Sequence, residues 1–320
     1  MATRRVKAAA PSDELSASLK TVKPGRLSFS GHETFALRYG WLSKGVSLAE
    51  QDPAAFLRDD AVTILGVGKN MVGSIRHWCE VLGLVELDGR LKKGMVKPLG
   101  ELLFGARGLD PYLECHGTLW LLQWQLCRHP GAATTWHYAF TRWNKSVFTR
   151  DELVTWLLRV ASDSGDSKTS PASLKRDVDV FLRTYVPSQP DKQRVAEDSF
   201  DCPLAELGLI RGLESGSYQF QRGARTSLPP AILAVSLWEY WDLTAPEQRT
   251  LSFERVMYGP GSPGGTFQLS ETGMAELLGR LPTLAGITFD ESSGMRRLVR
   301  VARIAPKRDE LLRAYYGEAA

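Results

Sequence analysis

Apolar residues recur at three- and four-residue spacing after Lys69, at Met71, Val72, Ile75, Trp78, Cys79 and Leu82. This spacing predicts an amphipathic helix over 69–82, and Gly83 is a typical residue to end it. A shorter apolar helix face precedes the turn at Gly66 and Gly68. Two helices joined by this tight turn predict a helix-turn-helix. The stretch LVELDGRLKKGMVKP then predicts a β-hairpin, and together these segments indicate a winged helix.

The same order of patterns returns twice further along the chain. Thr149 and Ser170 are predicted to begin two helices, and CPLAELGLIRGLESGSYQFQRG (202–223) predicts a helix end followed by a hairpin. Near the C-terminus, LSFERVMY and SETGMAELLGRL predict helices and GITFDESSGMRRLVRVARI predicts a hairpin. The segment GPGSPGGT (259–266) predicts an exposed flexible loop, and LECHGTLWLLQWQL predicts a buried central helix.

These elements predict a mainly α fold with small antiparallel β wings. Repeated winged helix-turn-helix units would surround a central helical core. We expect a disordered basic arm over residues 1–26. Three domains are predicted to follow it: an N-terminal winged-helix domain over 27–105, a central helical domain with a second winged-helix-like unit over 106–244, and a C-terminal winged-helix-like domain over 245–320.

Composition narrows the class of protein. The chain is 43% hydrophobic and 24% charged, as in ordinary globular proteins, and it has no apolar run long enough for a membrane span. Its four cysteines form no C-x-x-C pair, which favours reduced thiols and a cytoplasmic location. A net charge of +4 is compatible with nucleic acid without requiring it.

Two kinds of cofactor site are excluded by spacing. The stretch ILGVGKNM resembles a phosphate-binding loop, but Thr63 replaces its first glycine and Asn70 replaces the hydroxyl residue that would hold magnesium. No set of His and Cys residues has the spacing of a zinc site. We therefore expect neither a bound nucleotide nor structural zinc.

Basic residues gather at equivalent places in the three units. On or near the exposed face of the helix over 69–82 lie Lys69, Asn70, Ser74, Arg76 and His77. The wing that follows carries Arg90, Lys92, Lys93 and Lys97. The second recognition helix carries Lys175, Arg176 and Arg183, and the last hairpin carries Arg296, Arg297, Arg300 and Arg303. Asn can pair with adenine, and Lys or Arg with guanine or phosphate, so we favour DNA contact for the first cluster. A solvated charged face is an equal alternative for the later two.

Candidate catalytic residues are fewer. The segment SGHETF places His32 beside Glu33, and these two are the candidate catalytic residues for phosphodiester hydrolysis, with histidine as a possible general base. The same letters form a capping box from Ser30 to Glu33, the commoner meaning of this motif. Acidic residues in the loop AEDSFDC could hold a metal or only solvate the loop: Glu197, Asp198 and Asp201. The aromatic residues of TTWHYAF could stack on bases: Trp136, His137 and Tyr138.

Several motifs occur together in the order of a known family: FSGHETFALRYGWLSKG, LGVGKNMVGSIRHW, DPYLECHGTLWLLQWQL and SLKRDVDVFLRTY. In this the chain resembles the SspB-type DNA nickase family, a bacterial domain-of-unknown-function family of single-strand DNA phosphorothioation systems, over roughly residues 27–316. The resemblance implies nicking of double-stranded DNA during phosphorothioate modification and anti-phage defence. It also implies three partners, which are a cysteine desulfurase, an ATP-pyrophosphatase-like enzyme and an ATPase.

Magnesium is the metal expected from nuclease chemistry, although no ligand motif identifies its site. A different class of function also fits the visible helix-turn-helix units. In that alternative the protein is a non-catalytic winged-helix regulator, or a scaffold that recruits the sulfur-transfer and ATPase partners.

Overall fold

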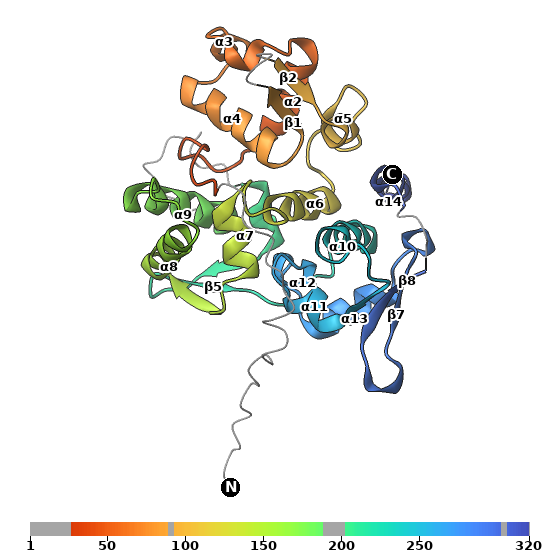
Figure 1. Ribbon diagram of the computed structural model, residues 1–320. Helices are drawn as coiled ribbons and strands as arrows, with labels where there is room; N and C mark the ends of the chain where they lie inside the picture. Colours follow the sequence, from red (N-terminus) through yellow and green to blue (C-terminus); the bar gives the residue numbers. More distant parts are fainter. Residues whose placement is uncertain (1–26, 89–92, 188–201, 302–305, 320) are drawn as a thin grey trace.

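The computed structural model describes residues 27–88, 93–187, 202–301 and 306–319 (Figure 1). The expected arm over 1–26 lies outside these residues. Helices dominate, and the strands form small antiparallel sheets, as the sequence predicts. No helix in the described ranges is long and apolar enough to cross a membrane.

The N-terminal unit contains the predicted helix, glycine turn, helix and hairpin. Its elements are α2 (Trp41–Gln51), η1 (Ala55–Leu57), α3 (Ala61–Leu65), α4 (Lys69–Val81), β1 (Val85–Asp88), β2 (Lys93–Val96) and α5 (Pro98–Phe104). Gly66 ends α3 with φ 65° and Gly83 follows α4 with φ 69°. Both are left-handed conformations that favour glycine, which explains why the helices end there.

The central unit begins with the buried helix α6. Its elements are α6 (His116–Cys127), α7 (Thr134–Thr141), β3 (Val147–Thr149), α8 (Arg150–Asp163), α9 (Pro171–Tyr185), η3 (Pro203–Leu207), β4 (Ile210–Gly212) and β5 (Ser217–Phe220). The predicted helix starts are confirmed, because Thr149 forms a capping box with Glu152 and the Ser170 side chain caps α9. Strand β3 was not predicted; it pairs with β5, and the sheet order is β3-β5-β4.

The C-terminal unit repeats this order. Its elements are α10 (Pro230–Thr244), β6 (Thr250–Ser252), α11 (Phe253–Tyr258), α12 (Pro263–Thr266), α13 (Glu271–Gly279), η4 (Thr283–Ala285), β7 (Ile287–Asp290), η5 (Ser292–Gly294), β8 (Arg297–Arg300) and α14 (Arg308–Ala319). The sheet order is β6-β8-β7. In both units a helix, a strand, further helices and a hairpin follow one another, and the first strand pairs with the last.

One prediction for this unit is wrong. The segment 259–266 is not an exposed loop, because it includes the buried helix α12. Its glycines allow close packing: a Cβ on Gly264 would lie 2.5 Å from the Met257 carbonyl oxygen, and one on Gly265 would lie 3.1 Å from that of Phe140. The glycines therefore fit this segment between neighbouring backbones rather than making it flexible.

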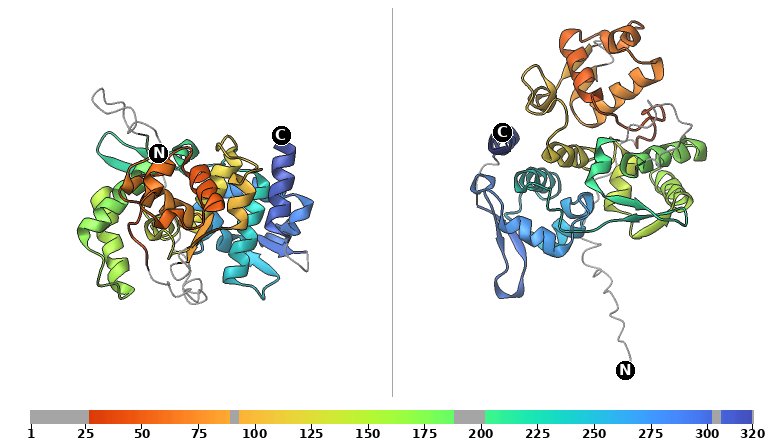
Figure 2. Two further views of the ribbon diagram at one scale, coloured as in Figure 1. Left: turned by 90° about the horizontal axis from the view of Figure 1, so that it is seen from above. Right: turned by 180° about the vertical axis from the view of Figure 1, so that it is seen from behind.

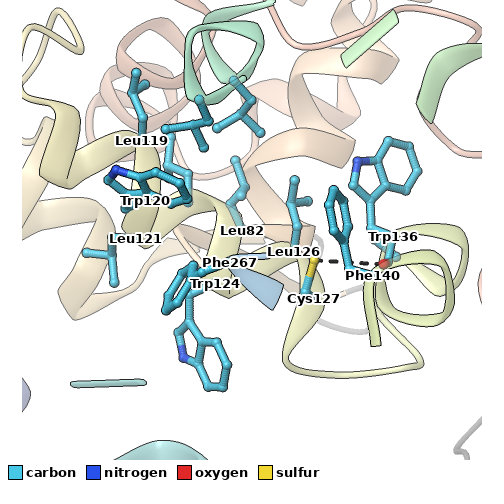
Figure 3. Packing of buried hydrophobic residues seen from close by; sticks show 14 of the residues in the cluster. Leu82, Leu119, Trp120, Leu121, Trp124, Leu126, Cys127, Trp136, Phe140 and Phe267 are labelled. Atoms are coloured by element: carbon cyan, nitrogen blue, oxygen red, sulfur yellow. Dashed lines mark hydrogen bonds between the residues drawn. The ribbon is translucent and has the colours of Figure 1, made fainter. Parts of the chain in front are cut away.

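The buried helix α6 lies where the three units meet (Figures 1 and 2). Figure 3 shows Trp120 and Trp124 of α6 beside Phe267, with ring centroids 5.7 and 6.1 Å apart. Leu82, at the end of α4, belongs to the same buried cluster as Leu126 of α6 (Figure 3). Aromatic packing of this kind dominates the energetics of a core, so these contacts join α6 to the C-terminal unit.

Candidate nucleic-acid interface

The segment SGHETF is a looped turn and not the start of a helix. Ser30, Gly31, Glu33 and Thr34 have φ values of 68°, 99°, 47° and 67°, and the next helix begins only at Trp41. The capping-box interpretation of Ser30 and Glu33 is therefore wrong. Several residues in left-handed conformations are unfavourable unless surrounding contacts impose them.

A buried carboxylate supplies those contacts. Asp177 of α9 accepts hydrogen bonds from the Ser30 backbone N–H at 2.8 Å and from the Thr135 hydroxyl. It also lies 2.8 Å from Nε2 of His32, and both side chains are almost completely buried. The Thr34 backbone N–H donates to His32 Nδ1 at 3.2 Å, so the network assigns the ring proton to Nε2. Both ring nitrogens of His32 are thus engaged.

The loop packs along one face of α4. Residues 69, 70, 73, 76 and 77 share that face by helical spacing. A Cβ on Gly31 would lie 2.6 Å from Nδ1 of His77, and a Cβ on Gly73 would lie 3.2 Å from Cγ of Glu33. The loop therefore covers the His77 end of the face and carries Glu33 over its middle.

Glu33 is the exposed acidic group of this arrangement. Its side chain has no hydrogen bond or ion pair within the part of the chain that the structure describes. One turn away on α4, Lys69 and Asn70 are also exposed, while Arg76 is half-buried. An open carboxylate thus lies beside cationic and amide side chains that suit a phosphodiester backbone.

Two predicted members of the exposed face lie elsewhere. Ser74 is fully buried, so its expected position was wrong. His77 is half-buried against the loop, with its ring 5.8 Å from the ring of His32. The accessible face of α4 therefore consists of Lys69, Asn70 and part of Arg76.

Burial of the histidines makes the fold sensitive to acid. Desolvation lowers the pKa of His77 from 6.5 to about 4, aided by the nearby His32 and opposed by Asp177. Desolvation also lowers the pKa of His137 to about 4. Each histidine stays neutral in the fold at pH values where the unfolded chain binds a proton.

We therefore expect the free energy of unfolding to be largest above pH 6.5 and to fall as the pH drops towards 4, by roughly 3 kcal/mol for each histidine. Urea unfolding at a series of pH values measures this loss. The His77→Gln variant should show a weaker dependence than the wild type. A flat profile between pH 6.5 and 4.5 would contradict the assignment.

The predicted cations in the described part of the β1–β2 hairpin region differ in their contacts. Lys93 is exposed at the start of β2, whereas the Lys97 ammonium lies 2.7 Å from a carboxylate oxygen of Glu86. Arg90 and Lys92 lie outside the described residues. Among the described residues of this hairpin, Lys93 is therefore available for phosphate.

Cations of the middle unit divide in the same way. Lys175 and Arg176 are exposed on α9. Arg183 donates a hydrogen bond of 2.7 Å to the Thr34 carbonyl oxygen, so it helps to hold the loop. The predicted DNA contacts of this helix thus remain open for Lys175 and Arg176, while Arg183 has a structural partner.

The arginines of the last hairpin are paired with carboxylates. Arg296 contacts Glu271 and Glu291, Arg297 contacts Asp290, and Arg300 contacts Asp242. Arg296 also stacks on Phe253, 3.5 Å from the ring centroid. These contacts favour a structural role over DNA binding for this cluster. Arg303 lies outside the described residues.

Base stacking by TTWHYAF is also disfavoured. Trp136 and His137 are buried, and His137 Nδ1 lies 2.5 Å from the Cys127 carbonyl oxygen. Tyr138 is half-buried, with its ring 6.1 Å from that of Trp156. Trp136 and His137 therefore belong to the core around α7 and are not available as a stacking surface.

The described residues do not form a preformed magnesium site. They contain no group of three or more His, Cys, Asp or Glu side chains that could hold a metal ion. Asp177 is already an acceptor for three donors, which leaves Glu33 as a single open carboxylate on this face. The predicted acidic group Glu197, Asp198 and Asp201 lies outside the described residues.

Sequence reasoning missed the residue that organises the loop. Asp177 shares the buried side of α9 with Leu174, Val178 and Phe181. An aspartate on the apolar face of an amphipathic helix is a signal, because a buried carboxylate requires partners. That signal indicates a buried polar contact without identifying His32.

Comparisons with known proteins cover nearly the whole chain. Residues 29–316 match the family described as "Protein of unknown function (DUF4007)". A solved structure described as "Magnesium ion-bound SspB crystal structure" is 33% identical, with a TM-score of 0.80 over 91% of this chain and 88% of the other. Another, "SspB crystal structure", is 32% identical with a TM-score of 0.79 over the same shares. None of the curated proteins compared with the chain matches it significantly.

Proposed function

The chain belongs to the DUF4007 family of SspB-type proteins, and from this we propose that it binds and nicks duplex DNA in a phosphorothioate-modification system. One observation carries the proposal: the open carboxylate of Glu33 lies over α4, one turn from the exposed Lys69 and Asn70. The His32–Asp177 contact holds the loop in this position.

We also propose that the three repeated units are winged helices. The central and C-terminal units have a helix, a strand, helices and a hairpin in that order, with the first strand beside the last. In the N-terminal unit, α4 occupies the position of a recognition helix after a tight turn. Lys69 and Asn70 at its N-terminal end would meet the DNA first.

In the proposed reaction Glu33 is the general base. Its carboxylate takes a proton from water, the oxygen attacks phosphorus, and the bond to one sugar oxygen breaks while that oxygen takes a proton from solvent. Lys69 would hold the phosphate by charge. His32 acts through the loop, because its ring nitrogens are already bonded to Asp177 and Thr34.

Magnesium belongs to the proposal as the nuclease metal, as does cooperation with a cysteine desulfurase, an ATP-pyrophosphatase-like enzyme and an ATPase. Magnesium usually binds through one or two carboxylates together with phosphates and water. The single open carboxylate on this face does not make such a site by itself, so no step of the reaction above is drawn through the ion.

A non-catalytic DNA-binding scaffold is the second candidate. It is favoured by the helix, tight turn and helix at α3 and α4, which can bind DNA without a catalytic group. Both candidates predict duplex binding through α4, and they differ in whether the phosphodiester bond is broken.

Lys69→Ala tests the binding surface that both candidates share. We expect it to weaken duplex binding about tenfold at low salt, and to reduce the slope of log affinity against log salt by about one, because one phosphate contact is lost. Fluorescence anisotropy at several salt concentrations measures both quantities. Arg297→Ala, which removes a cation already paired with Asp290, is the control and should change neither. Unchanged affinity in Lys69→Ala would refute the assigned face.

A further inference from the structure

A depression of about 530 Å³ lies beside the start of α4, at the turn between the two helices. Its lining includes Arg38, Trp41, Val62, Val67, Gly68 and Met71. The volume falls within the usual range of small-ligand pockets, and apolar side chains form most of the walls. Nothing in the proposed nicking reaction uses this depression.

The charged part of the wall is the Arg38 guanidinium, which lies near two aromatic rings. The Arg38 guanidinium carbon lies 5.5 Å from the ring centroids of both Phe35 and Trp41. A guanidinium group is planar, so beside aromatic rings it can form one wall of a stacking site. Such a wall suits a flat ring.

The surroundings favour an anionic polymer. Lys44 is exposed, and its ammonium lies 3.3 Å from the carbonyl oxygen of Leu65, at the entrance to the turn. Lys69, which directly follows Gly68, is exposed at the other side of the depression. None of the residues that line the depression is acidic. An apolar pocket with a cationic rim matches a nucleobase whose phosphates lie outside.

We propose that this depression receives a single nucleobase that has left the stack of the DNA bound at α4. The base would stack within the apolar walls beside Arg38, while Lys44 and Lys69 contact its flanking phosphates. The proposal rests on the proposed DNA binding and adds a base-binding subsite to it. It concerns binding, and it is independent of whether Glu33 breaks a bond.

Gly68 provides a variant that fills the pocket without disturbing the fold. Its backbone is extended, with φ −64° and ψ 158°, and an added Cβ meets nothing within 4 Å. Gly68→Leu should therefore place an aliphatic group in the depression. Gly68→Ser is the matched control, because serine is small and is favoured at the N-cap position that Gly68 occupies.

The probes are a short duplex with one extrahelical thymidine and the same duplex with an abasic residue in the bulge. The wild type should bind the thymidine bulge at least about fivefold more tightly than the abasic bulge, since stacking of one base contributes that much. Gly68→Leu should bring this ratio close to one, whereas Gly68→Ser should keep it. Lys69→Ala should weaken binding to both probes and preserve their ratio.

A wild-type ratio of one, or a ratio unchanged in Gly68→Leu, would overturn the base-binding subsite while leaving duplex binding intact. Absence of binding to either probe and to the fully paired duplex would instead refute the proposed function, and the subsite with it. The anisotropy of labelled duplexes, measured at one salt concentration, separates these outcomes.

Discussion

Glu33→Gln is expected to reduce the rate of DNA nicking by about 10²- to 10⁴-fold, the usual contribution of a general base. Duplex affinity and thermal stability should stay close to those of the wild type. The carboxylate is exposed and has no partner in the described part of the chain, so its loss leaves no buried group unpaired. Conversion of supercoiled plasmid to the open circle measures the rate.

The control for this variant is Asp59→Asn, which neutralises another exposed carboxylate of the same unit. It should nick like the wild type. Equal rates for Glu33→Gln and Asp59→Asn would remove Glu33 from the reaction, whatever the DNA affinity shows.

His32→Ala is expected to have the largest effect on stability. It removes a buried ring, leaves Asp177 with one donor fewer, and should lower the free energy of unfolding by about 3 kcal/mol. Nicking should be lost as well, because the loop no longer holds Glu33 over Gly73. Urea unfolding and the plasmid assay measure these two losses.

Asp177→Asn tests whether His32 positions the loop or transfers a proton. Asparagine has the size of aspartate and keeps one acceptor oxygen, so the buried network is weakened but not emptied. If His32 acts by positioning, the free energy of unfolding and the nicking rate should both decrease in this variant. The pH profile of nicking should keep its shape. A pH profile that loses a limb in Asp177→Asn while stability is unchanged would assign proton transfer to His32 instead.

Local patterns were sufficient for the N-terminal unit. The apolar spacing after Lys69 and the positive-φ glycines on either side of α4 are properties of neighbouring residues, and α4 runs from Lys69 to Val81 as expected. The helix starts at Thr149 and Ser170 were predictable for the same reason, since a capping side chain bonds within its own first turn.

Contacts between distant segments were not predictable. The strands β3 and β6 have three residues each and exist because they pair with β5 and β8, as Val147 does with Gln219. The His32–Asp177 contact joins positions 145 residues apart, and no pattern near either residue encodes the other. The turn at Ser30 was mistaken for a helix start because its letters match a cap, whereas the tertiary contacts of Asp177 decide its conformation.

The candidate site was predicted in part. Lys69, Asn70 and Glu33 are exposed and lie on one surface, while Ser74 is buried and His77 faces the loop. The arginines of the last hairpin were expected from sequence to be available, but their acidic partners come from β7, α10, α13 and the turn after β7. Charge counted along a chain does not show which charges are neutralised by folding.

The most direct test of the account is the conversion of supercoiled plasmid to open circle by the purified protein, in buffer with magnesium, alongside the Glu33→Gln and Lys69→Ala variants. We expect open circles without linear DNA for the wild type, loss of nicking with retained binding for Glu33→Gln, and weaker binding with slower nicking for Lys69→Ala. If the wild type binds the plasmid and leaves it supercoiled, the nicking centre at Glu33 is refuted and a DNA-binding scaffold stands in its place.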